Sequence, residues 1–147
     1  MKPPLATSVD KEEIRAGLAD GTIDAIATDH APHTDWEKGQ EMDQAPFGII
    51  GLETALPLAL SLVEAGVLSL TDMIRKFTEG PATILRRPIG RLRIGALADI
   101  TIIDPTAEWT VREESFLSKS KNSPFIGWKM KGRAEAVIVA GNLIENI

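Results

Sequence analysis

The chain of 147 residues contains no cysteine, no tyrosine and only two histidines. Without cysteine there is no disulfide, no thiolate ligand for a metal ion and no cysteine nucleophile, which fits a cytoplasmic protein. No apolar run approaches the roughly 20 residues that cross a bilayer. No signal-peptide pattern follows Met1, because Lys2, Pro3 and Pro4 are not succeeded by an apolar segment. We therefore expect no membrane partner.

Basic residues are also scarce, since 16 Lys and Arg stand against 21 Asp and Glu, for a net charge of −5. A nucleic-acid-binding surface needs a basic stripe, so we expect no nucleic acid as partner. Lys129, Lys131 and Arg133 form a local cluster that we interpret as a solvated face. With 44% hydrophobic and 25% charged residues, the composition is that of a globular protein with one domain or two small ones.

The first part of the sequence predicts a helix followed by a buried strand. Thr7 or Ser8 can cap a helix over residues 10–19, and Gly21 stops it. Residues 23–28 are mostly apolar without strict alternation, which is typical of a parallel strand buried on both faces. A helix followed by such a strand is half of a βα repeat.

A long polar stretch, residues 29–44, comes next. Loops of this length without regular structure are uncommon in compact domains and usually functional. Residues 51–65 then show a helical apolar pattern. Pro57 interrupts it and should kink the helix or leave one turn unsatisfied.

A further helix is predicted by the capping box of Ser69 and Asp72, and should run to about Phe77. Gly80-Pro81 is expected to end it, and Pro81 to start a short turn through Leu85.

After Arg86 the sequence changes character. Residues 100–103 and 134–140 are rich in β-branched and small apolar residues, which predicts strands. Gly141-Asn142 fits the two-residue turn of a hairpin. The chain is thus α/β first and β later, with a boundary near residues 86–93. Because the first part has a single expected strand, it cannot close a core, and we expect a fragment of a larger fold.

The stretch from Asp29 to His33 is the strongest candidate for chemistry. A carboxylate and two imidazoles, His30 and His33, fall within five residues at the end of the expected strand. In α/β barrels the chemistry lies at that end. Oxygen and nitrogen donors together suit zinc or a similar ion. The alternative is a turn in which Asp29 accepts hydrogen bonds from backbone amides. Either way this stretch supplies at most two or three ligands.

Four separated motifs resemble dihydroorotases of the amidohydrolase superfamily, in that family's order. The sequence ATDHAPHT resembles its last barrel-strand motif, and APFGIIGLET resembles its substrate loop. SKSKNSPFIGW is similar to a segment of the bacterial single-chain (class I) and multifunctional-complex types. The motifs span residues 27–34, 45–54, 78–99 (TEGPA, GRL and GALAD, the exit to the small domain) and 118–128.

The resemblance implies the C-terminal portion of a (β/α)8 TIM-type barrel plus a small composite β-sandwich domain. Residues 1–88 would hold the last barrel strand and flanking helices, and residues 89–147 the small β domain. Such enzymes reversibly cyclise N-carbamoyl-L-aspartate to L-dihydroorotate in de novo pyrimidine biosynthesis, using one or two zinc ions. This portion alone is expected to be inactive.

The resemblance also implies roles for individual residues. Asp29 would ligate zinc, take a proton during attack and pass it to the leaving ring nitrogen. His33 would bind the substrate carboxylate or ring oxygen. Phe47 and Gly48 would contact the pyrimidine through backbone groups. Apart from the resemblance, alternation of side chains along the chain predicts that His30, next to Asp29, points away and serves the structure.

Several family features are missing. The His-x-His pair, a further carboxylate or carbamylated lysine, two more histidines and the substrate-binding arginine are absent. Lys2 stands where the family commonly has asparagine, and Ala6 where it has arginine. We expect Trp109 and Trp128 to pack in the small domain, and Glu53 to favour the helix dipole.

Two alternatives remain open. One is another cyclic amidohydrolase, of hydantoinase or allantoinase type. The other is a non-catalytic dihydroorotase-like subunit that scaffolds aspartate carbamoyltransferase, although Asp29 together with His33 argues against it. A homo-oligomer is expected, because the strand over residues 23–28 and the helix over 51–65 would expose apolar surface in this chain.

Overall fold

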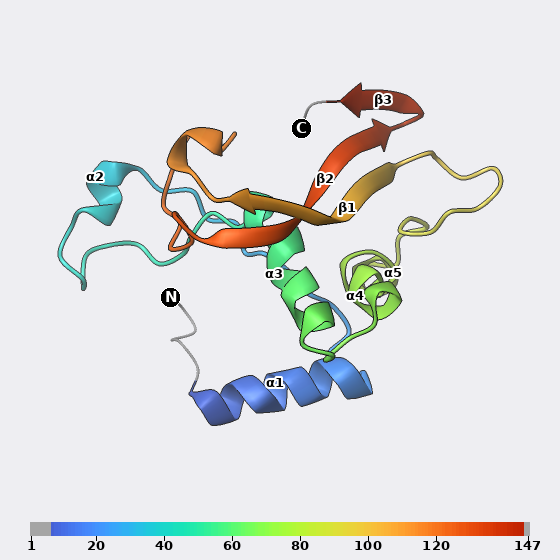
Figure 1. Ribbon diagram of the computed structural model, residues 1–147, viewed down its shortest axis with the longest axis horizontal. Coiled ribbons are helices and arrows are strands. Elements are labelled where there is room, and N and C mark those ends of the chain that lie inside the picture. The colour runs from blue at the N-terminus through green and yellow to red at the C-terminus, as the bar shows by residue number, and fades with distance from the viewer. Residues whose placement is uncertain (1–6, 146–147) are drawn as a thin grey trace.

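The computed structural model describes residues 7–145 (Figure 1). Lys2 and Ala6, where the family pattern is broken, lie outside the described residues. The elements in chain order are α1 (Ser8–Asp20), α2 (Asp35–Lys38), α3 (Leu52–Glu64), α4 (Leu70–Phe77), α5 (Glu79–Ile84), β1 (Ile100–Thr110), the 3-10 helix η1 (Glu113–Ser115), β2 (Lys129–Val139) and β3 (Asn142–Glu145).

Helix α3 lies between two apolar clusters and joins them. In Figure 1 the sheet lies above α3 and α1 lies below it. Ala59 and Leu60 of α3 are buried in the cluster that α1 and α4 complete, whereas Leu58 packs against the cluster of the β part. The first cluster contains Leu18, Ala59, Leu60, Leu68 and Met73, and the second contains Ile50, Val111, Phe116 and Met130. Burying apolar side chains on several faces makes α3 the central element.

The three strands form one antiparallel sheet in the order β1-β2-β3. Both predicted strands are confirmed, but β1 continues to Thr110 and β2 begins at Lys129. The hairpin turn is Ala140-Gly141, one residue earlier than predicted, because Val139 pairs with Asn142. Both turn residues have positive φ, 50° and 83°, as a type I′ turn requires.

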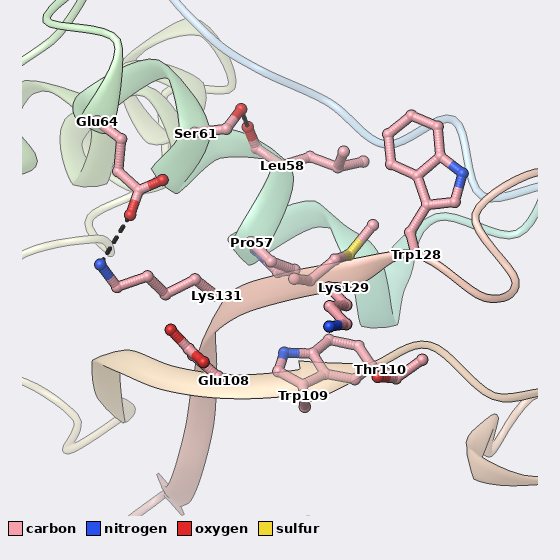
Figure 2. Close-up of a pocket in the computed structure, with 11 residues that line it drawn as sticks. Pro57, Leu58, Ser61, Glu64, Glu108, Trp109, Thr110, Trp128, Lys129 and Lys131 are labelled. Atoms are coloured by element: carbon pink, nitrogen blue, oxygen red, sulfur yellow. Dashed lines mark hydrogen bonds and ion pairs between the residues drawn. The ribbon is translucent and has the colours of Figure 1, made fainter.

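The expected β-sandwich is not formed within the described residues, which contain a single sheet. A sandwich needs a second sheet on the first, and here α3 packs against β2 instead. Figure 2 shows this contact, in which Lys131 Nζ lies 2.9 Å from Glu64 Oε1. Gly132 permits the close approach: its φ is +97°, and a Cβ there would overlap the side chain of Leu60.

Of the two tryptophans predicted to pack in the small domain, Trp109 does so, whereas Trp128 stays largely exposed. Trp109 packs against the second cluster, and its Nε1 donates to the carbonyl of Gly132 at 3.0 Å. Trp128 is 55% exposed and meets Phe125 edge to face, with ring centroids 5.3 Å apart.

The predicted helices are confirmed for α1, α3 and α4. The hydroxyl of Thr7 accepts from the amide of Asp10, and Asp10 reciprocates, which closes the capping box of α1. Gly21 ends α1 with φ +88°. Ser69 caps α4 by accepting from the amide of Asp72 at 3.0 Å. Pro57 lies inside α3 and is buried, so the carbonyl of Glu53 has no amide donor one turn later.

The prediction that Gly80-Pro81 ends a helix is wrong. The break falls at Thr78, with φ −122° and ψ −81°, and α5 runs through both residues. Pro81 is the third residue of α5, where a backbone N–H would have no partner within the helix, so its missing donor costs nothing there.

The strand predicted over residues 23–28 is not formed, and the expected burial on both faces is wrong. The described residues provide no neighbouring strand for a ladder, and Asp24 and Ala27 are exposed. The segment is held instead by α4 and its end. The amide of Ile26 donates to the carbonyl of Lys76 at 3.0 Å, and Lys76 Nζ donates to the carbonyl of Ile23.

We expect Gly80→Ala to destabilise the chain although alanine favours helices. A Cβ at Gly80 would overlap the backbone carbonyl oxygen of Asp24, which cannot move without shifting the whole segment. Overpacking of this kind costs about 1–3 kcal/mol, which outweighs a helix-propensity gain of about 1 kcal/mol.

Gly17→Ala in α1 is the matched control. Its Cβ would meet the side chain of Ile23 at 3.3 Å, which can adjust, and that of Thr22 at 3.8 Å, an ordinary van der Waals distance. Urea denaturation of both variants checks the prediction. Equal stabilisation by the two substitutions would contradict it.

Candidate functional site

Two segments distant from the β part in sequence meet at the start of α3. One contains Asp29, His30 and His33, and the other contains Phe47 and Gly48. The amide of Ala31 donates to the carbonyl of Ile49 at 2.9 Å, and His30 and Ile49 form an isolated parallel bridge. This pairing fixes the register of the two segments.

Asp29 is exposed and has a left-handed backbone, with φ 45°. Aspartate tolerates this conformation better than most residues, at a cost of about 1 kcal/mol. Its carboxylate forms no hydrogen bond or ion pair with residues 7–145. The alternative reading, a turn in which Asp29 accepts backbone amides, is therefore not what this part of the chain forms.

His30 serves the structure, as predicted. Its Nδ1 accepts from the amides of Gly51 at 3.1 Å and Leu52 at 3.4 Å. These amides belong to the first turn of α3, which has no acceptor of its own because Gly51 carries no side chain. His30 thus caps α3 from a distance, and Nδ1 must be the unprotonated nitrogen.

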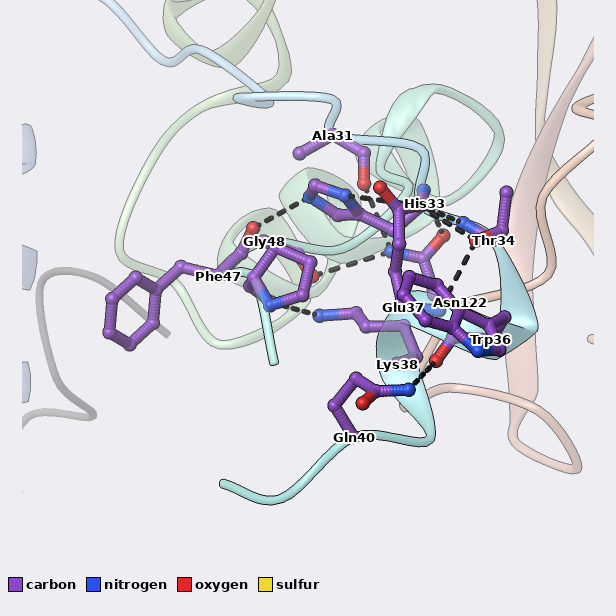
Figure 3. A network of polar contacts seen from close by, with 11 residues as sticks. Ala31, His33, Thr34, Trp36, Glu37, Lys38, Gln40, Phe47, Gly48 and Asn122 are labelled. Carbon is purple, nitrogen blue, oxygen red and sulfur yellow. Dashed lines mark hydrogen bonds and ion pairs between the residues drawn. The ribbon is translucent and has the colours of Figure 1, made fainter. Parts of the chain in front are cut away.

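His33 contacts the second segment directly (Figure 3). Its Nε2 lies 2.9 Å from the carbonyl oxygen of Phe47. Because a carbonyl only accepts, Nε2 carries the hydrogen and donates. The other nitrogen, Nδ1, lies 3.9 Å from Glu37 Oε2. Hydrogen bonds from the amide and hydroxyl of Thr34 lower the pKa of Glu37, and nearby His33 adds to this.

Gly48 is the position at which the two segments come closest. Its φ is +108°, and a Cβ there would lie 2.5 Å from the Cβ of Ala31. Only glycine fits both constraints. Phe47 is 58% exposed. His33, Phe47 and Gly48 are thus brought together, whereas the side chain of Asp29 bonds to none of them.

Asn122 is part of this arrangement and was not singled out from the sequence. Its Nδ2 donates to the carbonyls of Ala31 at 2.9 Å and Gly48 at 3.3 Å. Its Oδ1 accepts from the amide of His33 at 3.3 Å. An asparagine in a loop almost 90 positions from His33 carries no pattern that predicts these partners.

The loop that carries Asn122 is fastened in two ways. Lys121 Nζ donates to the carbonyls of Phe116 and Ser118, at 2.8 and 3.0 Å. Glu53 Oε1 accepts from the amide of Ser118 at 3.2 Å. Glu53 lies in the first turn of α3, where the helix dipole favours it as predicted, but it also ties this loop to the helix.

The residues present do not make a zinc site by themselves. No group of three or more His, Cys, Asp or Glu side chains is placed to hold a metal ion within residues 7–145. His30 Nδ1 and His33 Nε2 are engaged with the backbone. The unengaged carboxylate of Asp29 falls short of the three protein ligands of a catalytic zinc.

The groove of Figure 2 is separate from these residues. It lies between α3 and the sheet, has a volume of about 590 Å³ and is lined by residues such as Pro57, Trp109 and Trp128. Asp29, His33, Phe47 and Gly48 are not among its lining residues. In the part of the chain described, no helix has the length and apolar character needed to cross a membrane.

The capping role of His30 predicts graded effects of substitution. His30→Ala removes the acceptor of two α3 amides, and the free energy of unfolding should fall by about 1–2 kcal/mol, as for other lost caps. His30→Asn places an amide oxygen near the position of Nδ1 and should retain much of this stability. Thermal or urea unfolding checks the order. Equal losses in both variants would contradict the cap.

Comparisons with known proteins show which family this chain resembles. The profile of the amidohydrolase family matches residues 3–144. The chain is 54% identical over 144 residues to the dihydroorotase of Geobacter sp. (strain M21), covering 98% of this chain and 34% of that protein. It is 57% identical over 143 residues to the dihydroorotase of Syntrophotalea carbinolica, covering 97% of this chain and 34% of that protein.

A solved structure, an L-hydantoinase (dihydropyrimidinase) from Arthrobacter aurescens, superposes with a TM-score of 0.90 at 31% identity. The match covers 98% of this chain and 33% of that one. The chain thus spans about a third of the length of the relatives it matches. The resemblance to dihydroorotases found in four sequence motifs is confirmed, and the chain belongs to the amidohydrolase family.

Proposed function

We propose that this chain is the C-terminal portion of a dihydroorotase, which interconverts N-carbamoyl-L-aspartate and L-dihydroorotate in pyrimidine biosynthesis. The observation that carries the proposal is the carboxylate of Asp29, which has no partner among residues 7–145 and lies four positions before His33. His33 is itself held against Phe47 and Gly48. Identities of 54% and 57% to dihydroorotases, over nearly the whole chain, support it. In the whole enzyme, residues 1–88 would hold the last barrel strand and flanking helices, and residues 89–147 would form the small β domain.

In this proposal Asp29 has two roles. It would supply one ligand to zinc, and its carboxylate would hold the proton released during attack and return it to the leaving ring nitrogen. A zinc ion held by Asp29 and by ligands from outside this chain would provide hydroxide near neutral pH and polarisation of the amide carbonyl. Because this chain lacks the remaining ligands, they would have to come from outside it. The left-handed backbone of Asp29 fits a functional position, where strained conformations concentrate.

His33, Phe47 and Gly48 would bind the substrate. The Nε2 hydrogen of His33 is donated to the carbonyl of Phe47. To donate to a substrate carboxylate or ring oxygen, Nε2 would exchange this carbonyl for the substrate. The backbone of Phe47 and Gly48 would then face the planar amide of the ring, which uncharged backbone groups recognise well.

A hydantoinase-type cyclic amidohydrolase is the second candidate, since the L-hydantoinase superposes on this chain with a TM-score of 0.90. Higher identity to dihydroorotases favours the first candidate. No contact within the described residues favours the scaffolding alternative. A homo-oligomer, association with aspartate carbamoyltransferase and a cytoplasmic location stay predictions.

Asp29→Asn tests the proton role in a completed enzyme, meaning this chain joined to the remaining two thirds of the Geobacter sp. dihydroorotase. The amide keeps the shape but cannot accept the proton, so kcat should fall at least ~10²-fold, as for other acid–base groups. Asp24→Asn, an exposed aspartate of the same segment, is the matched control and should leave kcat unchanged. Near-normal turnover of Asp29→Asn would refute the assignment.

The 147-residue chain by itself should neither hydrolyse dihydroorotate nor retain zinc. The reason is the ligand count, since one carboxylate does not hold a zinc ion tightly. Metal analysis after dialysis against a mild chelator checks this. One zinc per chain with turnover above background would show that the site is complete without other residues.

A further inference from the structure

We infer that Asn122 is a positioning residue of the substrate site, holding the His33 and Gly48 segments in one register. The inference rests on the proposed function, because it assigns those segments to substrate binding. Asn122 lies in the loop between η1 and β2, so a residue of the β part would set the geometry of residues that precede α3.

The contacts of Asn122 use both ends of its amide. The amide of His33 can only donate, so it must face Oδ1. The carbonyls of Ala31 and Gly48 can only accept, so they must face Nδ2. Figure 3 shows the side chain of Asn122 between these groups. The partners therefore fix the amide in a single orientation.

The backbone of Asn122 adds a fourth bond. Its carbonyl accepts from the amide of Ile50 at 3.2 Å, and Ile50 is 1% exposed in the second apolar cluster. Asn122 thus bonds the segment of Ala31 and His33 on one side and the segment of Gly48 and Ile50 on the other. The same two segments pair directly through Ala31 and Ile49. No other side chain within residues 7–145 bonds the backbone of both segments.

Other residues anchor the loop but do not reach the site. Glu53 fastens Ser118, and Lys121 closes the loop on itself. These contacts hold Asn122 in place before substrate arrives. A preorganised residue of this kind affects where the binding groups lie, and small displacements of such groups weaken catalysis strongly.

Amide hydrogen exchange of the chain tests whether Asn122 holds the two segments together, and it needs no enzyme activity. Asn122→Ala should speed exchange of the His33 amide at least ~10-fold, since its acceptor is lost. Asn122→Asp keeps an acceptor for that amide but sets a carboxylate against the carbonyls of Ala31 and Gly48. It should leave the His33 amide protected and speed exchange of the Ala31 amide. Unchanged exchange in Asn122→Ala overturns the inference.

Kinetics of the completed enzyme test the functional part. Both variants should raise the KM for dihydroorotate at least ~10-fold, because the binding segments lose their register. Asn142→Ala is the matched control, since Asn142 also bonds two carbonyls, of Val139 and Ala140, but in the distant hairpin. It should leave KM unchanged.

A purely structural role would reduce the active fraction, and hence kcat, without moving KM. Faster exchange with an unchanged KM therefore overturns the inference. If the unmodified completed enzyme does not turn over dihydroorotate, the proposed function fails. In that case the hydrogen-exchange experiment alone tests whether Asn122 holds the two segments in register, and faster exchange in Asn122→Ala supports it.

Discussion

The first amides of α3 have no acceptor within the helix, and this is the constraint on which the rest of this structure depends. A helix that begins at a glycine has no side chain to accept its first amides, so acceptors must come from elsewhere. His30 supplies one through Nδ1, bonded to Gly51 and Leu52. Just before the helix, the amide of Ile50 finds the carbonyl of Asn122. Satisfying this one helix end draws three distant parts of the chain together.

This arrangement positions the candidate site residues, although the contacts at the helix start are made mainly by other residues. His30 caps the helix, and its neighbour Asp29 has a left-handed backbone and a carboxylate without a partner among residues 7–145. The same contact places Ala31 beside Ile49, and Ala31 then leaves no space for a side chain at position 48, which is glycine. Structural residues and candidate chemical residues therefore alternate along a short sequence.

Sequence reasoning succeeded where the signal is local. Thr7, Ser69 and Gly21 mark helix ends through their own backbone neighbours, and each is found where predicted. His30 was correctly assigned to the structure. Position-specific features were harder: the hairpin turn is displaced by one residue, since Ala140 adopts a positive φ that alanine rarely has.

Failures came from long-range partners. The strand over residues 23–28 has the right composition, but a strand needs a neighbour, and the described residues offer none. The helix break at Thr78 depends on packing of α5 against the segment near Asp24, which Gly80 permits. Asn122 was missed for the same reason, because its partners lie 74 to 91 positions away. The site residues themselves were chosen from a resemblance, and their roles stay predictions.

The central claim is that these residues serve a dihydroorotase and not another cyclic amidohydrolase. The most direct measurement is the ratio of kcat/KM for dihydroorotate to that for hydantoin in the completed enzyme, with the same zinc loading for both substrates. The account predicts a preference for dihydroorotate of at least ~10²-fold, since polar groups placed for one substrate reject an analogue that leaves them unpaired. Equal use of both substrates, or a preference for hydantoin, would contradict it.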